Sequence, residues 1–233
     1  MTPPAPQALI FDVFGTLVDW RSSIAREAEA LLGAQGVQAD WHVFADDWRD
    51  QYQPAMEEVR TGRLPFSKLD LLHRRNLDVV LQALGLGHVG EAVRTRLNLA
   101  WHRLDAWPDV TPDLARLRER FLLAPCSNGN VSLMVDLARH NRWHWDAILG
   151  AEFARDYKPK PAVYLAAADA LGLAPQQVMM VAAHSSDLAA AARAGLQTAF
   201  IARPDEHGPG LGEHTPTVPV RIAVRRLEEL LQL

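Results

Sequence analysis

The chain has 233 residues, of which 48% are hydrophobic, so it is long and apolar enough for one well-packed domain plus an insertion. Its formal net charge is -4 and its basic residues are scattered among acidic ones, which gives no electrostatic reason to expect a nucleic-acid partner. No run approaches the roughly 20 apolar residues of a membrane span, and the first residues lack a basic segment followed by an apolar one, so we expect a cytoplasmic protein with no membrane contact.

Residues 8–11 are predicted to form the first and central strand of a sheet. This apolar run leads directly into Asp12, and the turn residues Gly15 and Thr16 follow. A strand that is buried on both faces has such a continuous apolar sequence, and it delivers the next residue to a loop at its carboxyl end. A single motif of this kind more often marks an ordinary turn. The importance of Asp12 therefore depends on the polar residues that follow later strands.

Residues 20–105 are predicted to be a helical insertion, because no strand pattern interrupts them. Apolar residues recur at helical spacing over 22–32, 41–61, 68–84 and 91–104. Pro54 should kink or divide the second helix, and Ser67 with Asp70 resembles a capping box for the third. We expect this segment to fold over the end of the first strand as a cap, and its tryptophans offer a surface for a homodimer.

Beyond residue 105, predicted helices over 111–120, 131–140, 161–171, 187–194 and 224–231 alternate with strands over 121–126, 147–149, 178–183, 197–201 and 218–222. This alternation with short links predicts a doubly wound, Rossmann-like α/β core with a parallel sheet. The expected domains are a core of residues 1–19 and 106–233, which begins with a proline-rich lead-in over 1–6, and a helical cap of residues 20–105. The single cysteine, Cys126, excludes an internal disulfide and is expected to be a packing residue.

Polar residues follow four of the predicted strands. Asp12 follows the first strand, and Ser127 and Asn128 follow the strand over 121–126. Lys158, next to Pro159, and Asp187 follow two later strands. The carboxyl ends of parallel strands meet at one edge of an open sheet, so we expect these side chains to converge on one site.

The order D-x-x-G-T, S-N, K-P and a late aspartate resembles the haloacid dehalogenase superfamily of aspartate-nucleophile hydrolases, over nearly the whole chain. Phosphatases of that superfamily carry a second aspartate where this chain has Phe14, and an acidic residue where it has Ala182 and Ala183. Asp12 and Asp187 alone provide few of the oxygen ligands that octahedral magnesium requires. We therefore expect neither a metal nor another cofactor.

Phe14, with Ser-Asn-Gly at 127–129 and Tyr-Lys-Pro at 157–159, resembles the type II (S)-2-haloacid dehalogenases, and Arg49 and Tyr164 fit that branch. The resemblance implies that Asp12 attacks C2 of a small 2-haloalkanoic acid and displaces halide with inversion. Water then hydrolyses the resulting ester to give a 2-hydroxy acid. The expected partner is this small-molecule substrate.

The resemblance and the chemistry of each group give roles to the other site residues. Lys158 is expected to keep Asp12 ionised, because a nearby ammonium lowers the pKa of a carboxylate, and Thr16 to hydrogen bond to it. Arg49 and Asn128 are expected to donate to the departing halide. The remaining substrate contacts are expected from Ser127, from Tyr164 and from the backbone after Asp12 at Val13 and Phe14.

Two positions of the last motif leave alternatives open. Asp187 is expected to orient the hydrolytic water or Lys158, or else to cap a helix. His184 stands where well-known members carry asparagine, and Ser186 where they carry a pocket tryptophan. His184 is a base for ester hydrolysis, a hydrogen-bond donor or a structural histidine. For the whole chain the alternatives are a hydrolase of another electrophile, such as a phosphate ester or a strained ring, and a non-catalytic small-acid-binding relative.

Overall fold

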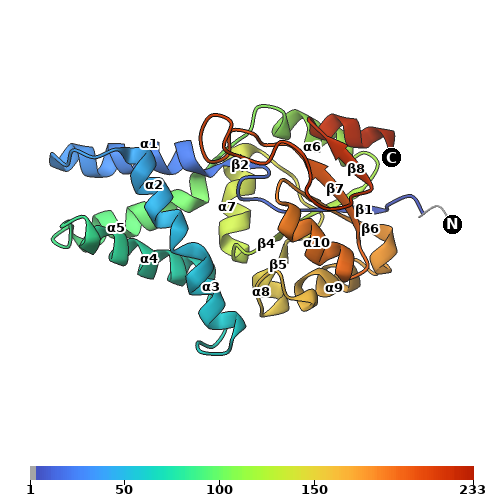
Figure 1. Cartoon of the computed structure of the whole chain (residues 1–233), viewed down its shortest axis with the longest axis horizontal. Helices are drawn as coiled ribbons and strands as arrows, with labels where there is room; N and C mark the ends of the chain where they lie inside the picture. Colours follow the sequence, from blue (N-terminus) through green and yellow to red (C-terminus); the bar gives the residue numbers. More distant parts are fainter. Residues whose placement is uncertain (1–3) are drawn as a thin grey trace.

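A sheet of six parallel strands forms the centre of the protein, seen in a computed structural model that describes residues 4–233 (Figure 1). The strand order is β5-β4-β1-β6-β7-β8. Their bounds are β1 Ala8–Phe11, β4 Leu122–Ser127, β5 Leu149–Gly150, β6 Val178–Ala182, β7 Gln197–Ile201 and β8 Ile222–Val224. The central place of β1, paired with β4 on one side and β6 on the other, is confirmed. It puts Asp12 in the middle of the sheet's carboxyl edge.

Successive residues of the strands face two separate apolar layers, as the two-residue period of a strand requires. Leu9 and Phe11 pack with α6 (Val110–Leu117), α7 (Val131–Asn141) and the 3-10 helix Leu227–Gln232. Ala8 and Ile10 pack with α9 (Pro161–Ala170) and α10 (Ser185–Arg193), and Cys126 is buried in the same layer. The predicted doubly wound α/β core is thus confirmed.

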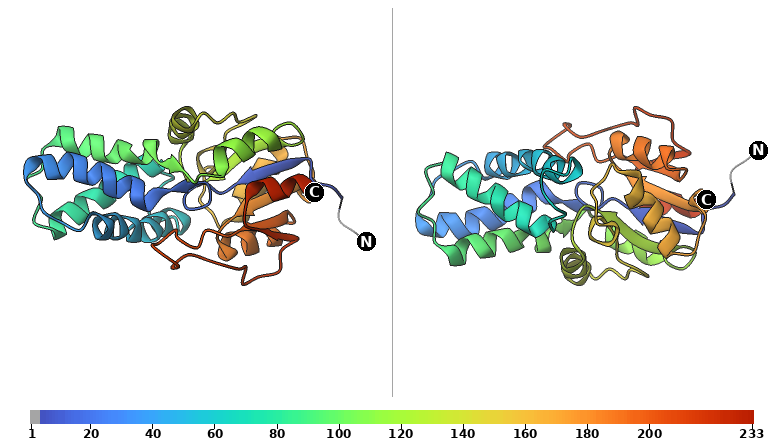
Figure 2. Two further views of the ribbon diagram at one scale, coloured as in Figure 1. Left: turned by 90° about the horizontal axis from the view of Figure 1, so that it is seen from above. Right: turned by 90° about the horizontal axis from the view of Figure 1, so that it is seen from below.

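The helices of the inserted segment form a bundle at the carboxyl end of the sheet (Figure 2). They are α1 Trp20–Leu32, α2 Trp41–Asp50, α3 Tyr52–Arg60, α4 Leu69–Ala83 and α5 Glu91–Asn98, with 3-10 turns Gly33–Gln35 and Leu99–Arg103. The chain enters and leaves this bundle through a short antiparallel ribbon of β2 (Val18–Asp19) and β3 (Asp105–Ala106). The predicted helical cap is confirmed, but the ribbon at its junction was not predicted.

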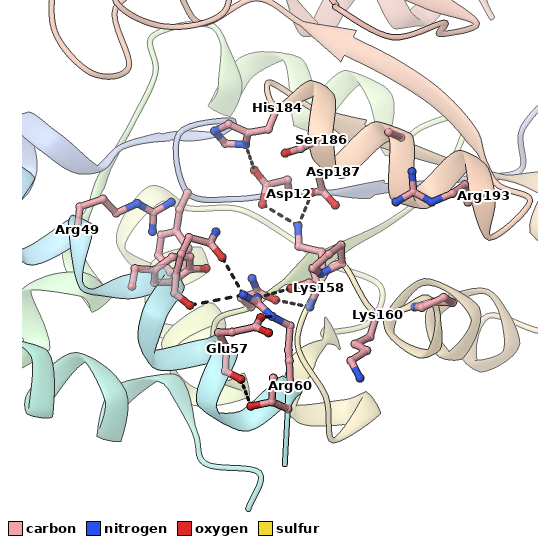
Figure 3. Close-up of a pocket in the computed structure, with 18 residues that line it drawn as sticks. Asp12, Arg49, Glu57, Arg60, Lys158, Lys160, His184, Ser186, Asp187 and Arg193 are labelled. Carbon is pink, nitrogen blue, oxygen red and sulfur yellow. Dashed lines mark hydrogen bonds and ion pairs between the residues drawn. The ribbon is translucent and has the colours of Figure 1, made fainter. Parts of the chain in front are cut away.

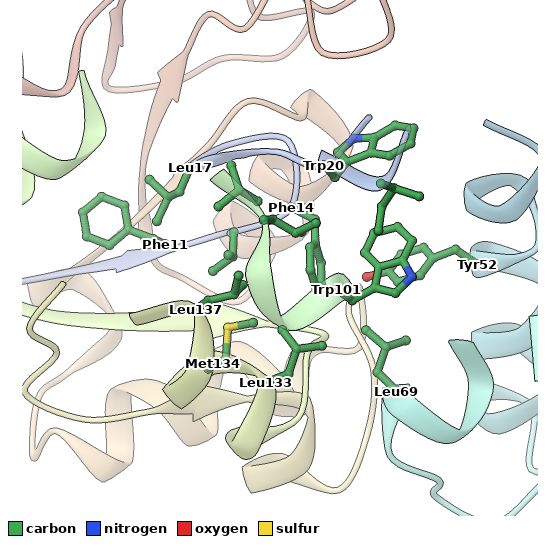
Figure 4. Close-up of a cluster of buried hydrophobic side chains, with 14 of the residues drawn as sticks. Phe11, Phe14, Leu17, Trp20, Tyr52, Leu69, Trp101, Leu133, Met134 and Leu137 are labelled. Carbon is green, nitrogen blue, oxygen red and sulfur yellow. The ribbon is translucent and has the colours of Figure 1, made fainter. Parts of the chain in front are cut away.

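Three of the four tryptophans of the cap lie inside it. Trp20, Trp48 and Trp101 are almost completely buried and pack near Phe14, which follows the first strand (Figure 4). Their aromatic surface fills the contact between cap and core. These three tryptophans therefore offer no surface for a partner subunit, and the homodimer stays a prediction.

Several predicted helix boundaries are corrected. The helix expected over 41–61 divides at Gln51 into α2 and α3, because Pro54 has no N–H to donate to the carbonyl of Asp50. The helix expected over 91–104 changes to a 3-10 turn after Asn98. The capping box is wrong: Ser67 hydrogen bonds to the carbonyl of Pro65, and α4 has no side-chain cap.

The carboxyl-terminal part differs from prediction in detail. The last strand, β8, lies a few residues later than expected, the final helix is of the 3-10 type, and a short helix, α8 (Ala151–Ala154), was not predicted. The proline-rich lead-in falls partly on residues 1–3, outside the described residues. Within residues 4–233 no helix is both long and apolar enough to cross a membrane.

Candidate active site

Asp12 is the first residue after β1, and only 7% of its surface is exposed. Its Oδ1 accepts a hydrogen bond from Lys158 Nζ at 2.9 Å (Figure 3), and its Oδ2 accepts one from Thr16 Oγ1 at 2.7 Å. Burial alone would raise the pKa of Asp12, but the charges of Lys158 and His184 hold it well below its usual range. The carboxylate is therefore ionised at neutral pH.

Lys158 lies between two carboxylates. Besides Asp12, its Nζ donates to Asp187 Oδ2 at 2.5 Å, and the hydroxyl of Tyr164 donates to Asp187 Oδ1 at 2.5 Å. Burial would lower the pKa of Lys158, yet the two carboxylates raise it well above its usual value. Asp187 contacts Lys158 from inside the first turn of α10, whose N-cap is His184, so the alternative of a helix-capping Asp187 is wrong.

The other predicted substrate-binding residues fall into two groups. Phe14 and Asn128 line the pocket above Asp12, and Asn128 Oδ1 also accepts a hydrogen bond from the backbone N–H of Lys158 at 2.9 Å. Val13, Ser127 and Tyr164 are buried and do not belong to the pocket wall. The hydroxyl of Ser127 accepts from the backbone of Gly129 instead, which shapes the loop that carries Asn128.

Arg49 reaches the pocket from α2, on the cap side (Figure 3). Its guanidinium carbon lies 4.0 Å from the ring centre of Tyr52 and 5.3 Å from that of Trp20. Attraction to these aromatic faces holds the side chain while leaving its N–H donors free. Arg49 Nη1 is buried and has no hydrogen-bond partner within residues 4–233. Because an unpaired buried donor is costly, this group is suited to an anion that enters the pocket.

His184 bridges Asp12 and a second carboxylate, Glu206. Its Nδ1 lies 3.0 Å from Asp12 Oδ2 and its Nε2 lies 2.8 Å from Glu206 Oε2. Burial would lower the pKa of His184, but hydrogen bonds to both carboxylates raise it to about 10. His184 is therefore a cation in the free protein, and it donates a hydrogen bond to each carboxylate.

Glu206 was missed by the sequence analysis. It comes from the loop after β7, is nearly buried, and also accepts a hydrogen bond from Trp20 Nε1 at 3.1 Å. No local motif marks it. The signal lies at Gly15, whose φ is +82°, because a Cβ there would stand 2.0 Å from Glu206 Oε1. The glycine of the first motif thus makes room for the carboxylate.

A pocket of about 890 Å³ opens at this edge of the sheet, between core and cap. It contains an ionised carboxylate, an aromatic-held guanidinium and a histidine paired with a carboxylate. Where a second aspartate would follow the first, the ring of Phe14 packs edge-on against Tyr52 and Trp101. Across residues 4–233, no group of three or more His, Cys, Asp or Glu side chains is arranged to hold a metal ion. These groups suit nucleophilic displacement of an anionic leaving group.

Comparisons with known proteins agree with this chemistry. The family model for haloacid dehalogenase-like hydrolases matches residues 6–195. The chain is 28% identical to (S)-2-haloacid dehalogenase 1 of Pseudomonas sp. (strain CBS-3), over 97% of this chain and 96% of that protein. The solved structure of a defluorinating L-2-haloacid dehalogenase is 40% identical, with a TM-score of 0.96 and coverage of 100% and 99%. Another L-2-haloacid dehalogenase structure is 43% identical, with a TM-score of 0.93 and coverage of 98% of both chains.

Proposed function

The chain belongs to the haloacid dehalogenase-like hydrolases, and we propose that it is a metal-independent (S)-2-haloacid dehalogenase, which hydrolyses small 2-haloalkanoic acids to 2-hydroxy acids. The observation that carries this proposal is the ionised Asp12 in the same pocket as the unpaired Arg49. The names of the relatives support it, since these proteins are 2-haloacid dehalogenases.

In the first half of the reaction a carboxylate oxygen of Asp12 forms a bond to C2 of the substrate. The carbon–halogen bond breaks, and its electron pair leaves with the halide, so the configuration at C2 inverts. N–H donors of Arg49 and Asn128 stabilise the negative charge that develops on the halogen. A halide leaves without a proton, which is consistent with Phe14 at the position where an acid would otherwise stand.

In the second half His184 acts as the base for ester hydrolysis. Esterification removes the charge of Asp12, one of the two anions that hold the proton on His184, so its pKa falls and it releases that proton to solvent. Neutral His184 then takes a proton from water as the water oxygen attacks the ester carbon of Asp12. When the intermediate collapses, this proton goes to the departing 2-hydroxy acid oxygen. The hydroxyl proton of the regenerated Asp12 returns to His184.

Oxygen labelling tests whether Asp12 is a nucleophile. In a single turnover of 2-chloropropionate in ¹⁸O water, with enzyme in excess, solvent oxygen should enter the peptide containing Asp12 and be largely absent from the lactate. The reason is that hydrolysis at the ester carbon leaves solvent oxygen on the protein. Label in lactate with none on the peptide would reject the ester mechanism.

A panel of substrates separates the alternative electrophiles. Halide release from 2-haloacids, without phosphate release from phosphate esters, is the result expected for a dehalogenase. Phosphate release alone would assign the family's phosphatase chemistry instead. Binding of 2-hydroxy acids with no turnover of either class would identify a non-catalytic relative.

We also propose that the boundaries between the domains lie at the β2–β3 ribbon. Residues 20–105 then form the cap, and residues 1–19 and 106–233 form the core. The antiparallel pairing of Asp19 with Asp105 supports this division, because both chain crossings occur there.

A further inference from the structure

The pocket is larger than a small haloacid requires. Its volume of about 890 Å³ lies in the range, roughly 300–1,000 Å³, that drug-sized ligands occupy. The groups assigned to the reaction account for only part of its wall; they are Asp12, Arg49, Asn128, Lys158 and His184. The rest of the wall is free to bind additional parts of a substrate.

The additional room runs along one face of α10. Ser186, Ala189 and Arg193 all line the pocket, and their spacing of three and four residues puts them on one side of the helix. Ser186 is small where the family resemblance implies a tryptophan, and Ala189 is smaller still. The pocket therefore extends from Asp12 to Arg193 without a bulky side chain from this helix.

Two cations border the outer part of the pocket. Lys160, just before α9, and Arg193, at the end of α10, both line it; both are exposed, and neither forms an ion pair within residues 4–233. The carboxylates of the wall are engaged elsewhere: Asp12 and Asp187 bind Lys158, and Glu57 binds Arg60 at 2.7 Å. An anion in the outer pocket would thus meet unpaired positive charge.

Arg49 and Arg193 lie on opposite sides of Asp12 in the close-up of the site, with Lys160 on the Arg193 side (Figure 3). A substrate with one anionic group would use only the donors near Asp12. One with a second anionic group at the far end of its chain would use both parts of the pocket, because a flexible chain can follow the open face of α10.

We propose that Arg193 and Lys160 form a distal anion subsite, and that the enzyme takes 2-haloacids bearing a second carboxylate, the 2-halodicarboxylates, in preference to uncharged chains of equal length. This inference rests on the proposed dehalogenase function and specifies its substrate class.

Binding of product analogues tests the subsite without any need for turnover. The affinity for 2-hydroxyglutarate is compared with that for 2-hydroxypentanoate, of equal carbon number, by titration calorimetry. We expect the diacid to bind more tightly, and the double variant Arg193→Gln with Lys160→Gln to reduce this preference about tenfold, as for the loss of two solvent-accessible ion pairs. The preference should also weaken as ionic strength rises. Arg139→Gln, an exposed arginine on α7 outside the pocket wall, is the matched control and should retain the preference.

Turnover provides the second measurement, as the ratio of kcat/KM for 2-chloroglutarate to that for 2-chloropentanoate. The ratio should exceed one in the wild type and fall in the double variant. Equal binding of the two hydroxy acids, or a preference that the double variant retains, would overturn the subsite. Preferential diacid binding without halide release from any substrate would uphold the subsite and reject the dehalogenase proposal, so the two failures are distinguishable.

Discussion

His184 lies between the carboxylates of Asp12 and Glu206, and this position determines when it can act. With both carboxylates charged its pKa is raised to about 10, so the free enzyme holds it as a cation. In the proposed mechanism, formation of the Asp12 ester removes one of these charges. The histidine is thus a poor base before the substrate has reacted and a better one afterwards, when water must be activated.

This arrangement predicts a pH-dependent second half-reaction. Ester hydrolysis in the wild type should accelerate as pH rises through the lowered pKa of His184 in the ester, because only the neutral imidazole accepts a proton. His184→Asn should lose this dependence and hydrolyse the ester about 10²- to 10⁴-fold more slowly. Rapid-quench mass spectrometry of the peptide containing Asp12 would measure this rate, because slow hydrolysis makes the ester accumulate.

The exposed His144 provides the control, since His144→Asn removes an imidazole that does not belong to the pocket wall. Its ester should hydrolyse at the wild-type rate. If His184→Asn showed an unchanged rate and pH profile, His184 would be a structural donor and not a base.

The residues that could be placed together from sequence are those in the segments between a strand and the next long helix. Asp12, Asn128 and Lys158 lie at the carboxyl edge because the strand order brings successive loops there. Glu206 could not be found in this way, because its loop is positioned by packing against Gly15 and Trp20. The hydrogen bond from the Tyr164 hydroxyl to Asp187 could not be predicted either. Helical periodicity identifies the buried face of a helix, but it does not show which polar group a hydroxyl on that face contacts.

At the scale of elements, α3 of the cap is hydrogen bonded to the loop that carries Lys158. Arg60, the last residue of α3, donates from Nη1 to the backbone carbonyl of Lys158 at 2.8 Å. Glu57, one turn earlier, accepts from Arg60 Nε at 2.7 Å and holds the side chain in place. A cap helix thereby helps to position the ammonium that keeps Asp12 ionised.

We therefore predict that Arg60 is a positioning residue. Arg60→Ala should lower kcat about tenfold, because small displacements of catalytic groups are costly, and Arg60→Lys should restore part of the loss. Steady-state kinetics with separate kcat and KM values would measure this. Arg75→Ala is the matched control, because Arg75 pairs with Glu58 within the cap and should leave kcat unchanged. Equal effects of Arg60→Ala and Arg75→Ala would contradict the assignment.

Among the elements, sequence periodicity located the long helices and strands but not their ends. The break before α3 depends on which carbonyl loses its partner at Pro54, a detail that periodicity does not contain. Asp70 resembled a capping residue, yet its carboxylate binds His102 and Asn130. The side chain that the local sequence assigned to a helix cap is therefore used in a tertiary contact.

Across the whole molecule, a buried histidine joins cap and core. His102 Nε2 lies 3.0 Å from Asp70 Oδ1 on α4, and its Nδ1 lies 2.8 Å from Asp136 Oδ2 on α7. Asn130, at the start of α7, donates to Asp70 Oδ2 at 2.8 Å. Burial would lower the pKa of His102, but the two carboxylates raise it above its ordinary value. Protonated His102 therefore stabilises the contact between the two parts.

The raised pKa fixes the direction of the pH effect on stability. The contribution of His102 should be fully present below its unfolded pKa of about 6.5, while both aspartates stay ionised, and should be lost as pH rises through its folded pKa. His102→Gln should thus reduce the free energy of unfolding most at mildly acidic pH, by about 1–3 kcal/mol. Denaturant unfolding of both proteins across pH would measure the difference.

His140 offers a control, because it pairs with Asp105 on the surface and is 35% exposed. His140→Gln should change stability little at any pH. A stability difference between the wild type and His102→Gln that stayed constant with pH would show that His102 acts through packing alone.

The ribbon of β2 and β3 has a consequence for the evolution of such proteins. Because Asp19 and Asp105 are paired neighbours, the cap begins and ends at almost one point of the core. A gene segment encoding such an insertion can be gained, lost or exchanged between relatives as a block while β1 keeps its place. New substrate ranges can thus arise by recombination of caps, while lineages inherit β1 and Asp12 unchanged.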